Sequence, residues 1–418
     1  MKLKKILATL LCVAMTIGTM GFSAFAEKMD YVAKIGEQDY ATLKDAFAAA
    51  EDGDVVMLVD NIEVNEAMTV SDDITLDLNG CTITGTDTKA SGNFALITIK
   101  KDATVIIDDT TGAGAITLEA ETDRGWNALS AVISNEGGNL TIEGGRLEHL
   151  GGSSMAYAID NNSTLGETTV TVNDGTIAST YRAIRAFQNS KTEMNTININ
   201  GGEISARAGI WMQQPGASAS HGTLNVTDGE FDCVANAIVT DLCGAGETEI
   251  NISGGDFKNQ STTANLLLVW PLDTMAKAEN ATVIMNIEGG TFDCAGEGKL
   301  FGFLDENNAT LENASDMVTV SGGEFNQAFD ESYLAENFSI VENQDGSFGV
   351  ANQVEKPSVV GDVDGDSDVD FIDATMALQA YTEAIILTAE QIAAADVNGD
   401  GTVDFLDATA ILQMWLNS

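Results

Sequence analysis

The sequence predicts a mainly β protein in which a long parallel β-helix solenoid, closed by an N-terminal capping helix, precedes a small all-α module. Three observations carry this prediction. A glycine-containing unit recurs every 26 to 35 residues from Leu140 onward, and apolar and polar residues alternate within each unit. Two acidic loops, 34 residues apart, follow near the C-terminus. Repeats of this length with period-two strands are typical of solenoids.

The N-terminus predicts export. Three lysines within the first five residues precede an apolar run over 6–20, and Ala24-Phe25-Ala26 follows. This is the layout of a secretory signal peptide that is cleaved after Ala26. The alternative is a membrane anchor, but the run is short for a span of about 20 residues. We therefore expect a signal peptide over 1–26 and a secreted, extracellular protein.

The charge balance limits the possible partners. The chain has 19 basic and 64 acidic residues, a formal net charge of −45. Such a charge repels nucleic acid and anionic membranes, so neither is expected as a partner. A hydrophobic content of 44% argues for a packed core over disorder. Four cysteines outside the signal peptide, in so long a chain, form neither a disulfide scaffold nor a zinc-site spacing.

The segment after the signal peptide predicts a cap and the first coils. Residues 42–50 form a helical pattern with Leu43, Ala46, Phe47 and Ala50 on one face, and 55–59 form a strand. An amphipathic helix of this kind covers the apolar end of a solenoid. The stretches 74–85 and 103–118 have the pattern of irregular early coils.

The repeat itself predicts the coil. In each unit a strand of alternating residues ends in a turn with glycine, and an apolar residue follows two positions later. No helical stripe lies between the turns, which disfavours leucine-rich and ankyrin arrays. The turn glycines are Gly145, Gly175, Gly202, Gly229, Gly255, Gly290 and Gly323. The apolar residues that should stack in one column are Leu147, Ile177, Ile204, Phe231, Phe257, Phe292 and Phe325.

Two further columns follow from the stacking of coils. An outward Thr/Asn column is expected to be a hydrogen-bonded polar ladder, with a sugar-contacting face as the alternative. Its members are Thr141, Thr171, Asn198, Asn225, Asn251, Asn286 and Thr319. Cys233 and Cys294 fall two coils apart. Two coil spacings of about 4.8 Å exceed the reach of a disulfide, so both should be unpaired.

Residues 31–350 resemble the right-handed parallel β-helix proteins of the pectate-lyase-like superfamily. We expect the β-helix domain to cover 27–350. The resemblance implies action on plant cell-wall polysaccharide, as a pectin-type lyase or a glycoside hydrolase, and no catalytic residue can be assigned. The alternative is a non-catalytic glycan-binding or structural protein. The stretch after each turn supplies the candidate substrate-binding residues Arg185, Arg207, Trp211, Asp241 and Trp270.

The C-terminal loops predict a calcium module over 361–418, after a linker at 351–360. Each loop places oxygen donors at positions 1, 3, 5, 9 and 12 and a backbone carbonyl at 7, which suits a hard cation such as Ca²⁺ better than Mg²⁺. Position 6 of the first loop is Ser367 in place of glycine, so that site could be weaker. The loop residues are Asp362, Asp364, Asp366, Asp368, Asp370, Asp373, Asp396, Asn398, Asp400, Thr402, Asp404 and Asp407.

The tandem loops, each running into a matching helix, resemble a type I dockerin. A middle helix should begin at Thr388, with Gln391 completing a capping box. The resemblance implies two Ca²⁺ ions and, as partner, a cohesin domain of a cellulosomal scaffold. The family's partner-reading positions are here Phe371, Ile372, Leu378, Gln379, Phe405, Leu406, Leu412 and Gln413. The near-identical halves suggest that either one can face the cohesin.

Overall fold

The computed structural model describes residues 31–121, 125, 128–151, 154–214, 221–241, 246–270, 282–304, 311–352, 360–366, 368–382 and 384–417. The expected signal peptide, most of the expected linker, Cys243 and Ser367 lie outside these residues. Within the described part, no helix is long and apolar enough to cross a membrane.

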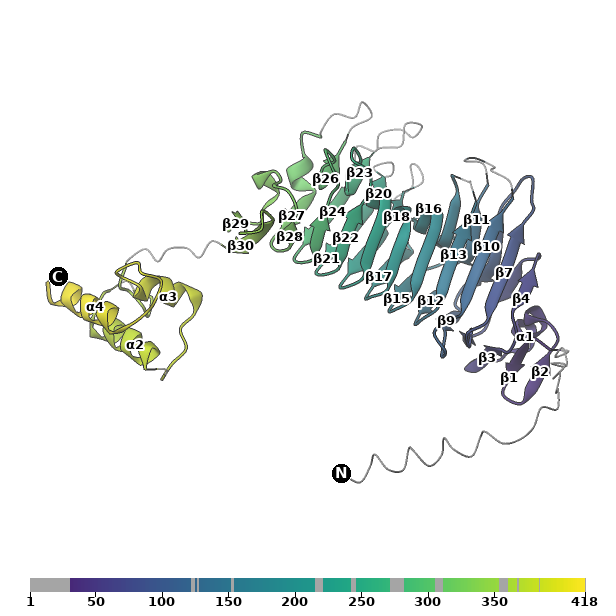
Figure 1. Cartoon of the computed structure of the whole chain (residues 1–418), viewed down its shortest axis with the longest axis horizontal. Coiled ribbons are helices and arrows are strands. Elements are labelled where there is room, and N and C mark those ends of the chain that lie inside the picture. The colour runs from purple at the N-terminus through teal and green to yellow at the C-terminus, as the bar shows by residue number, and fades with distance from the viewer. Residues whose placement is uncertain are drawn as a thin grey trace, which may run out of the picture.

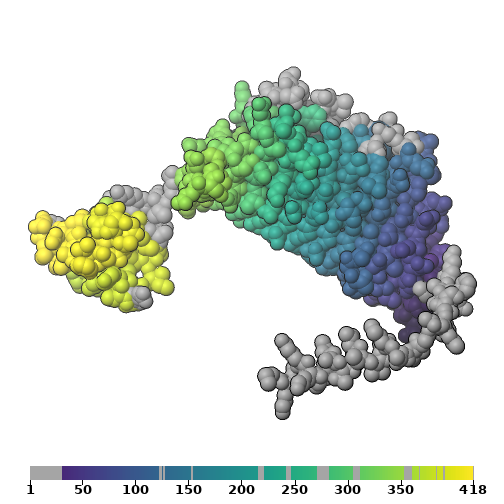
Figure 2. All heavy atoms as spheres, viewed as in Figure 1, coloured from purple at the N-terminus to yellow at the C-terminus, as the bar shows by residue number. Residues whose placement is uncertain are grey.

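The strands wind into a parallel β-solenoid with three faces, and successive coils lie side by side from purple near α1 to green near β28 (Figure 1). In space-filling view the coils form one continuous body (Figure 2). The first face holds β3 (Asp54–Leu58), β6 (Ile74–Asp77), β9 (Thr104–Asp108), β12 (Asn139–Ile142), β15 (Thr168–Val172), β17 (Met194–Ile199), β19 (His221–Val226), β21 (Glu247–Ile252), β24 (Thr282–Ile287) and β27 (Val318–Val320).

Two ladders of the other sheet make the remaining faces, and β16, β18 and β20 bend from one to the other. The second face holds β4 (Ile62–Val64), β7 (Thr82–Asp87), β10 (Ala115–Ala120), β13 (Arg146–Leu150), the first halves of β16 (Thr176–Phe187), β18 (Glu203–Gln213) and β20 (Glu230–Asp241), β22 (Asp256–Asn259), β25 (Thr291–Asp293) and β28 (Glu324–Phe325). The third face holds β5 (Met68–Val70), β8 (Phe94–Ile99), β11 (Ser130–Asn135), β14 (Ala156–Asn162), the second halves of β16, β18 and β20, β23 (Leu267–Trp270) and β26 (Phe301–Phe303).

The expected apolar column is confirmed along the second face. The register pairs Leu147 with Ile177, Ile177 with Ile204, and so on through Phe325, and all seven side chains are buried. Four rings, from Phe231 to Phe325, stack with neighbouring centroids 4.5 to 4.9 Å apart. The repeat therefore places large apolar side chains one above the other, and their contacts tie each coil to the next.

The backbone conformation explains why each turn of the repeat contains glycine. All seven adopt positive φ angles between 79° and 112°, a region that other residues rarely enter. At Gly175 a Cβ atom would also lie 2.5 Å from the carbonyl oxygen of Gly145 in the preceding coil. Glycine is thus required both by the turn and by the close stacking of the coils.

Both ends of the solenoid are closed. At the N-terminal end, the hairpin of β1 (Ala33–Ile35) and β2 (Gln38–Tyr40) joins β3, and helix α1 (Leu43–Ala49) begins after its N-cap Thr42. The predicted face of α1 is buried in the core. At the other end β28 pairs antiparallel with β30 (Phe348–Asn352), and β30 pairs with β29 (Phe338–Glu342). Two short 3-10 helices, Ala314–Asp316 and Glu331–Tyr333, precede this closure.

The predicted polar column is in register, and its hydrogen-bonded part runs from Thr171 to Asn286. Asn198 donates to Thr171, and Asn225, Asn251 and Asn286 each donate a side-chain hydrogen bond to the preceding asparagine, over 2.9 to 3.3 Å. The prediction for the two repeat cysteines is confirmed. Cys233 and Cys294 are both buried and free, as their two-coil separation required.

The C-terminal module consists of three helices around a small core. They are α2 (Phe371–Tyr381), α3 (Ala389–Ala395) and α4 (Phe405–Asn417). The capping box predicted at α3 is confirmed: Thr388 and Gln391 exchange side-chain and backbone hydrogen bonds. Small side chains such as Ala377 and Ala395, with Ile411, fill the space between the helices.

Candidate functional site

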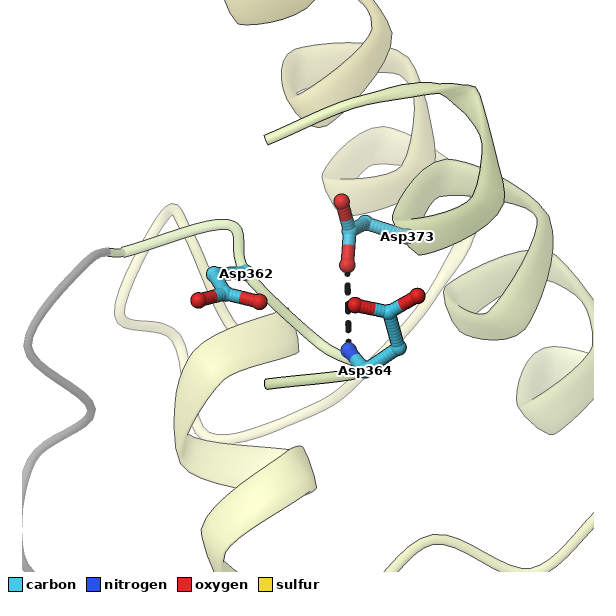
Figure 3. Close-up of side chains that lie close together, drawn as sticks. All are labelled: Asp362, Asp364 and Asp373. Carbon is cyan, nitrogen blue, oxygen red and sulfur yellow. Dashed lines mark hydrogen bonds between the residues drawn. The ribbon is translucent and has the colours of Figure 1, made fainter. Parts of the chain in front are cut away.

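Three carboxylates of the first acidic loop converge. Asp362, Asp364 and Asp373 each place an oxygen within 4.8 Å of the others (Figure 3). Asp373 lies in the first turn of α2, and its Oδ1 accepts from the backbone N–H groups of Val363 and Asp364 at 2.6 and 3.0 Å. The helix therefore brings its own carboxylate back to the start of the loop.

The second loop repeats this arrangement. Asp373 also accepts from the N–H of Asp370 at 2.7 Å, and Asp407 accepts from those of Asn398 and Asp404 at 3.2 and 3.0 Å. In both loops the position-12 aspartate thus receives the N–H groups of positions 3 and 9. Matching sequences have folded into matching geometry.

The module itself supplies no basic residue to its two most deeply buried carboxylates. Asp373 is 1% and Asp407 0% exposed, and no lysine, arginine or histidine follows Lys356 in the sequence. Burial, followed by the charges of neighbouring aspartates, holds the pKa of Asp364 above its usual value. Buried charges need a partner or a metal ion. The donor atoms of the loops are all oxygens, and several of them belong to carboxylates that lie close together. Such a donor set fits a hard divalent cation.

The outer surfaces of α2 and α4 are apolar and nearly two-fold symmetric. Phe371 is 54% and Phe405 52% exposed, and each packs at a tilt against a ring near the end of the opposite helix. The ring centroids of Phe371 and Trp415 are 5.9 Å apart, and those of Tyr381 and Phe405 are 6.3 Å apart. Four residue pairs, each 34 positions apart, line the groove between the helices: Phe371 and Phe405, Ala374 and Ala408, Thr375 and Thr409, Leu378 and Leu412.

The comparison with protein families matches these features. Residues 360–414 match the family model of the dockerin type I domain. The C-terminal module is a type I dockerin. A search of curated proteins and a search of solved structures returned no match to the chain. Dockerins dock on cohesin domains, which makes this a cellulosome-associated, extracellular protein. Type I dockerins generally bind calcium, in agreement with the donor set of the loops.

The predicted cohesin-reading residues of the dockerin are all exposed on α2 and α4. The prediction omitted Tyr381, Met414, Trp415 and Leu416, which are exposed on the same two helices. These residues are apolar although they lie outside the helix faces that are buried in the core, and this pattern could have identified them from the sequence. With them, the exposed apolar surface extends over both helices to their C-terminal turns.

On the solenoid, the five predicted substrate-binding residues separate into two groups. Arg185, Trp211, Asp241 and Trp270 lie on four successive coils of the third face: Arg185 pairs in register with Trp211, and Asp241 with Trp270. Trp211 and Asp241 are buried, and Trp270 is half-buried. Arg207 is exposed at the bend of β18, with its guanidinium 5.7 Å from the ring centroid of Tyr181.

Two arginines of the third face are enclosed by aromatic rings. Arg185 donates to Asp160 and Gln213, and its guanidinium lies 4.7 and 4.4 Å from the ring centroids of Tyr157 and Phe187. Arg182 donates to the carbonyl of Ser154 at 2.6 Å and lies 4.1 Å from the ring centroid of Trp211. Both cations are therefore engaged in the structure of the face.

Sequence reasoning also missed a buried polar chain. The Ser130 hydroxyl donates to Asp87 at 2.8 Å, and the Nε2 atom of His149 lies 2.9 Å from the same hydroxyl. The serine thus lies between the other two residues, whereas a nucleophilic triad has the histidine in the middle. His149 is fully buried and crosslinks coils through this chain.

The carboxyl group of Asp241 is the most perturbed acid on the third face. It accepts from the indole N–H of Trp211 at 3.0 Å, and its Oδ2 atom has no hydrogen-bond partner among the described residues. Burial raises the pKa of Asp241 to about 8, while Trp211 and Arg182 oppose the shift. The group is therefore mainly a neutral acid at pH 7.

Asp241→Asn should remove a pH dependence of solenoid stability. The folded state binds this proton more tightly than the unfolded chain, so the stabilisation is present below the unfolded pKa and is lost as pH rises through about 8. Asparagine keeps the acceptor for Trp211 and cannot ionise. Thermal unfolding at about pH 5 and about pH 9 should show a larger loss in the wild type than in the variant. Equal losses in the two proteins would contradict the assignment.

Proposed function

We propose that the dockerin holds two calcium ions and attaches a secreted polysaccharide-interacting solenoid to a cellulosomal scaffold. The proposed divisions of the chain are a signal peptide at 1–26, the β-helix domain at 27–350, a linker at 351–360 and the dockerin at 361–418. The observation that carries the docking function is the pair of matching loops, in which Asp373 and Asp407 are buried without any basic residue in the module.

The residues that would hold the ions are the twelve loop residues given above, with position 7 contributing its backbone carbonyl. Bound Ca²⁺ would neutralise the clustered carboxylates and fix the loops to the first turns of α2 and α4. The proposed contact with cohesin is the exposed apolar surface of α2 and α4, which contains no cation. We expect its affinity to depend little on ionic strength, because apolar burial is not screened by salt.

Titration of the full chain with a panel of cohesin domains, in calcium and at two salt concentrations, tests the docking function. Binding to at least one cohesin, with similar affinity at both salt concentrations, is the expected result. Failure to bind any cohesin, or affinity that falls steeply with salt, would count against the proposed surface.

For the solenoid, the proposal is contact with plant cell-wall polysaccharide. Aromatic rings beside paired carboxylates and guanidinium groups on the third face support this contact. Binding without chemistry is better supported than a lyase or a glycoside hydrolase. A lyase needs a basic side chain free to remove a proton. Arg182 and Arg185 are both engaged in hydrogen bonds and ring contacts, and Arg207, exposed at the bend of β18, lies beside the ring of Tyr181.

A hydrolase would need two carboxylates at a suitable separation. Asp160 and Asp241 lie three coils apart, which at about 4.8 Å per coil is about 14 Å along the axis. Hydrolases use carboxyl separations of about 5–9.5 Å. These two buried acids therefore cannot act together on one glycosidic bond.

Incubation with pectins, xylans and glucans separates binding from catalysis. The expected result is retention on polysaccharide without new reducing ends and without the ultraviolet absorbance of an unsaturated product. Either product signal would instead assign the solenoid as a hydrolase or a lyase.

A further inference from the structure

We propose that a groove on the third face, spanning β8 to β18, is the site at which the solenoid binds a neutral, rather than a uronic-acid, polysaccharide chain. This proposal rests on the proposed contact with polysaccharide and adds its place and its ligand class. The groove has a volume of about 570 Å³. Of the residues predicted from the sequence, it contains only Arg185.

A continuous polar chain forms the floor of the groove. Thr98, Ser134, Asp160 and Arg185 occupy the same register position on four successive coils. One carboxylate oxygen of Asp160 accepts a hydrogen bond from Arg185 Nε at 2.7 Å, and the other accepts one from the Ser134 hydroxyl at 3.4 Å. Arg185 also donates to the side chain of Gln213 at 3.2 Å. Because this chain crosses coil after coil, the groove runs along the solenoid axis.

The charged groups at the floor of the groove are buried and held by surrounding side chains. Asp160 is 0% and Arg185 4% exposed, and the ion pair is surrounded by side chains of several coils. Four coil spacings of about 4.8 Å give the groove a length of about 19 Å. A linear polymer with a short repeat, such as a glycan chain, fits a groove whose own walls repeat.

Two aromatic side chains line the groove, each beside a cation. Phe187 is half-buried, and its ring is held by the guanidinium of Arg185. Phe94 lies under the ammonium group of Lys89, 5.3 Å from the ring centroid, and Lys89 also donates to the carbonyl of Asn93. Phe94 is 5% exposed, so Phe187 is the ring that can face a sugar. An aromatic ring with neighbouring hydrogen-bonding groups matches the apolar face and hydroxyl edge of a sugar.

The charges of the lining favour a neutral ligand. Two cations, Lys89 and Arg185, and two anions, Glu136 and Asp160, line the groove. Arg185 is neutralised by Asp160, and Glu136 by Lys100 at 2.8 Å. Among the described lining residues a uronate chain would find no unpaired guanidinium, and the Lys89 ammonium already contacts the Asn93 carbonyl and the Phe94 ring. The chain would also meet a protein of net charge −45. A neutral glycan avoids this repulsion.

The test compares affinity electrophoresis of the full chain through gels containing soluble arabinoxylan, xyloglucan, glucomannan or polygalacturonate. We expect retardation by at least one neutral polysaccharide, independent of salt, and none by polygalacturonate. Phe187→Ala should lower this affinity at least tenfold, and Phe187→Tyr should retain it. Ala95→Trp adds bulk at the groove lining without removing a contact and should also abolish retardation.

Matched controls separate the groove from the rest of the solenoid. Ile284→Trp places the same side chain at an exposed position of the first face and should leave retardation unchanged, and Trp270→Ala tests the more C-terminal coils. If polysaccharide binds but only Trp270→Ala weakens it, the groove assignment fails while the polysaccharide function stands. Retardation by polygalacturonate alone overturns the ligand class. No retardation by any polysaccharide, with cohesin binding intact, overturns both.

Discussion

Removal of calcium is expected to unfold the dockerin and to abolish its binding to cohesin. Without a cation, the three carboxylates whose oxygens lie within 4.8 Å repel one another, and the module contains no basic residue that could pair with the buried Asp373 and Asp407. The core that must resist this repulsion is small and built mostly from alanine. A ligand present at 100 times its dissociation constant stabilises the fold by about 2.7 kcal/mol, which is a large part of the stability of so small a domain.

Calorimetry of the full chain provides the measurement. Two unfolding transitions should appear in calcium, and EDTA should remove the smaller one and leave the solenoid transition in place. Asp373→Ala with Asp407→Ala should have the same effect as EDTA, since these residues join the loops to α2 and α4. Calcium, but not magnesium, should restore the wild type. Cohesin binding and circular dichroism that are unchanged in EDTA would refute a structural role for the ions.

Changing one half of the dockerin should cost almost no cohesin affinity, whereas changing both halves should abolish binding. The exposed surface has nearly equivalent halves: Phe371 and Phe405 are equally exposed, and the groove lining consists of four pairs of identical residue types. If the cohesin accepts either half, Phe371→Ala with Ile372→Ala removes one of two orientations. The affinity then falls about twofold, or about 0.4 kcal/mol.

The reciprocal pair, Phe405→Ala with Leu406→Ala, is the matched control and should behave in the same way. The variant with all four changes should lose at least a hundredfold in affinity, about 2.7 kcal/mol, because no apolar half remains. Titration calorimetry against one cohesin gives all four affinities. A large loss from either double variant alone would show that the two halves are not interchangeable, in spite of their sequence and geometry.

The solenoid was predictable from sequence because its stabilising contacts repeat. Each glycine that enters positive φ and each member of the Leu147-to-Phe325 column recurs at a fixed place in its unit. One unit therefore predicts the contacts of the next, and the polar ladder and the unpaired cysteines follow from the same stacking. The dockerin was predictable for a related reason, since its ligands and caps are local in sequence.

The surface chemistry of the third face was not predictable in the same way. Whether Arg185 is a free base or half of a buried ion pair depends on Asp160 in the preceding coil and Gln213 in the next. The irregular lengths of the connecting segments set that register, and no motif encodes it. The same holds for the chain of Asp87, Ser130 and His149, whose members lie on three different strands.

By itself, the sequence determined the coil, the core column and the two acidic loops, because each depends on residue types at a fixed spacing. Only the tertiary structure decided which side chains meet across coils. It brought Asp160, Arg185 and Gln213 into one neutral groove floor, and it placed Phe371 against Trp415 and Phe405 against Tyr381. The physical reason is that charge compensation and burial are set by neighbours in space, which for these residues are 24 to 44 positions apart in the chain.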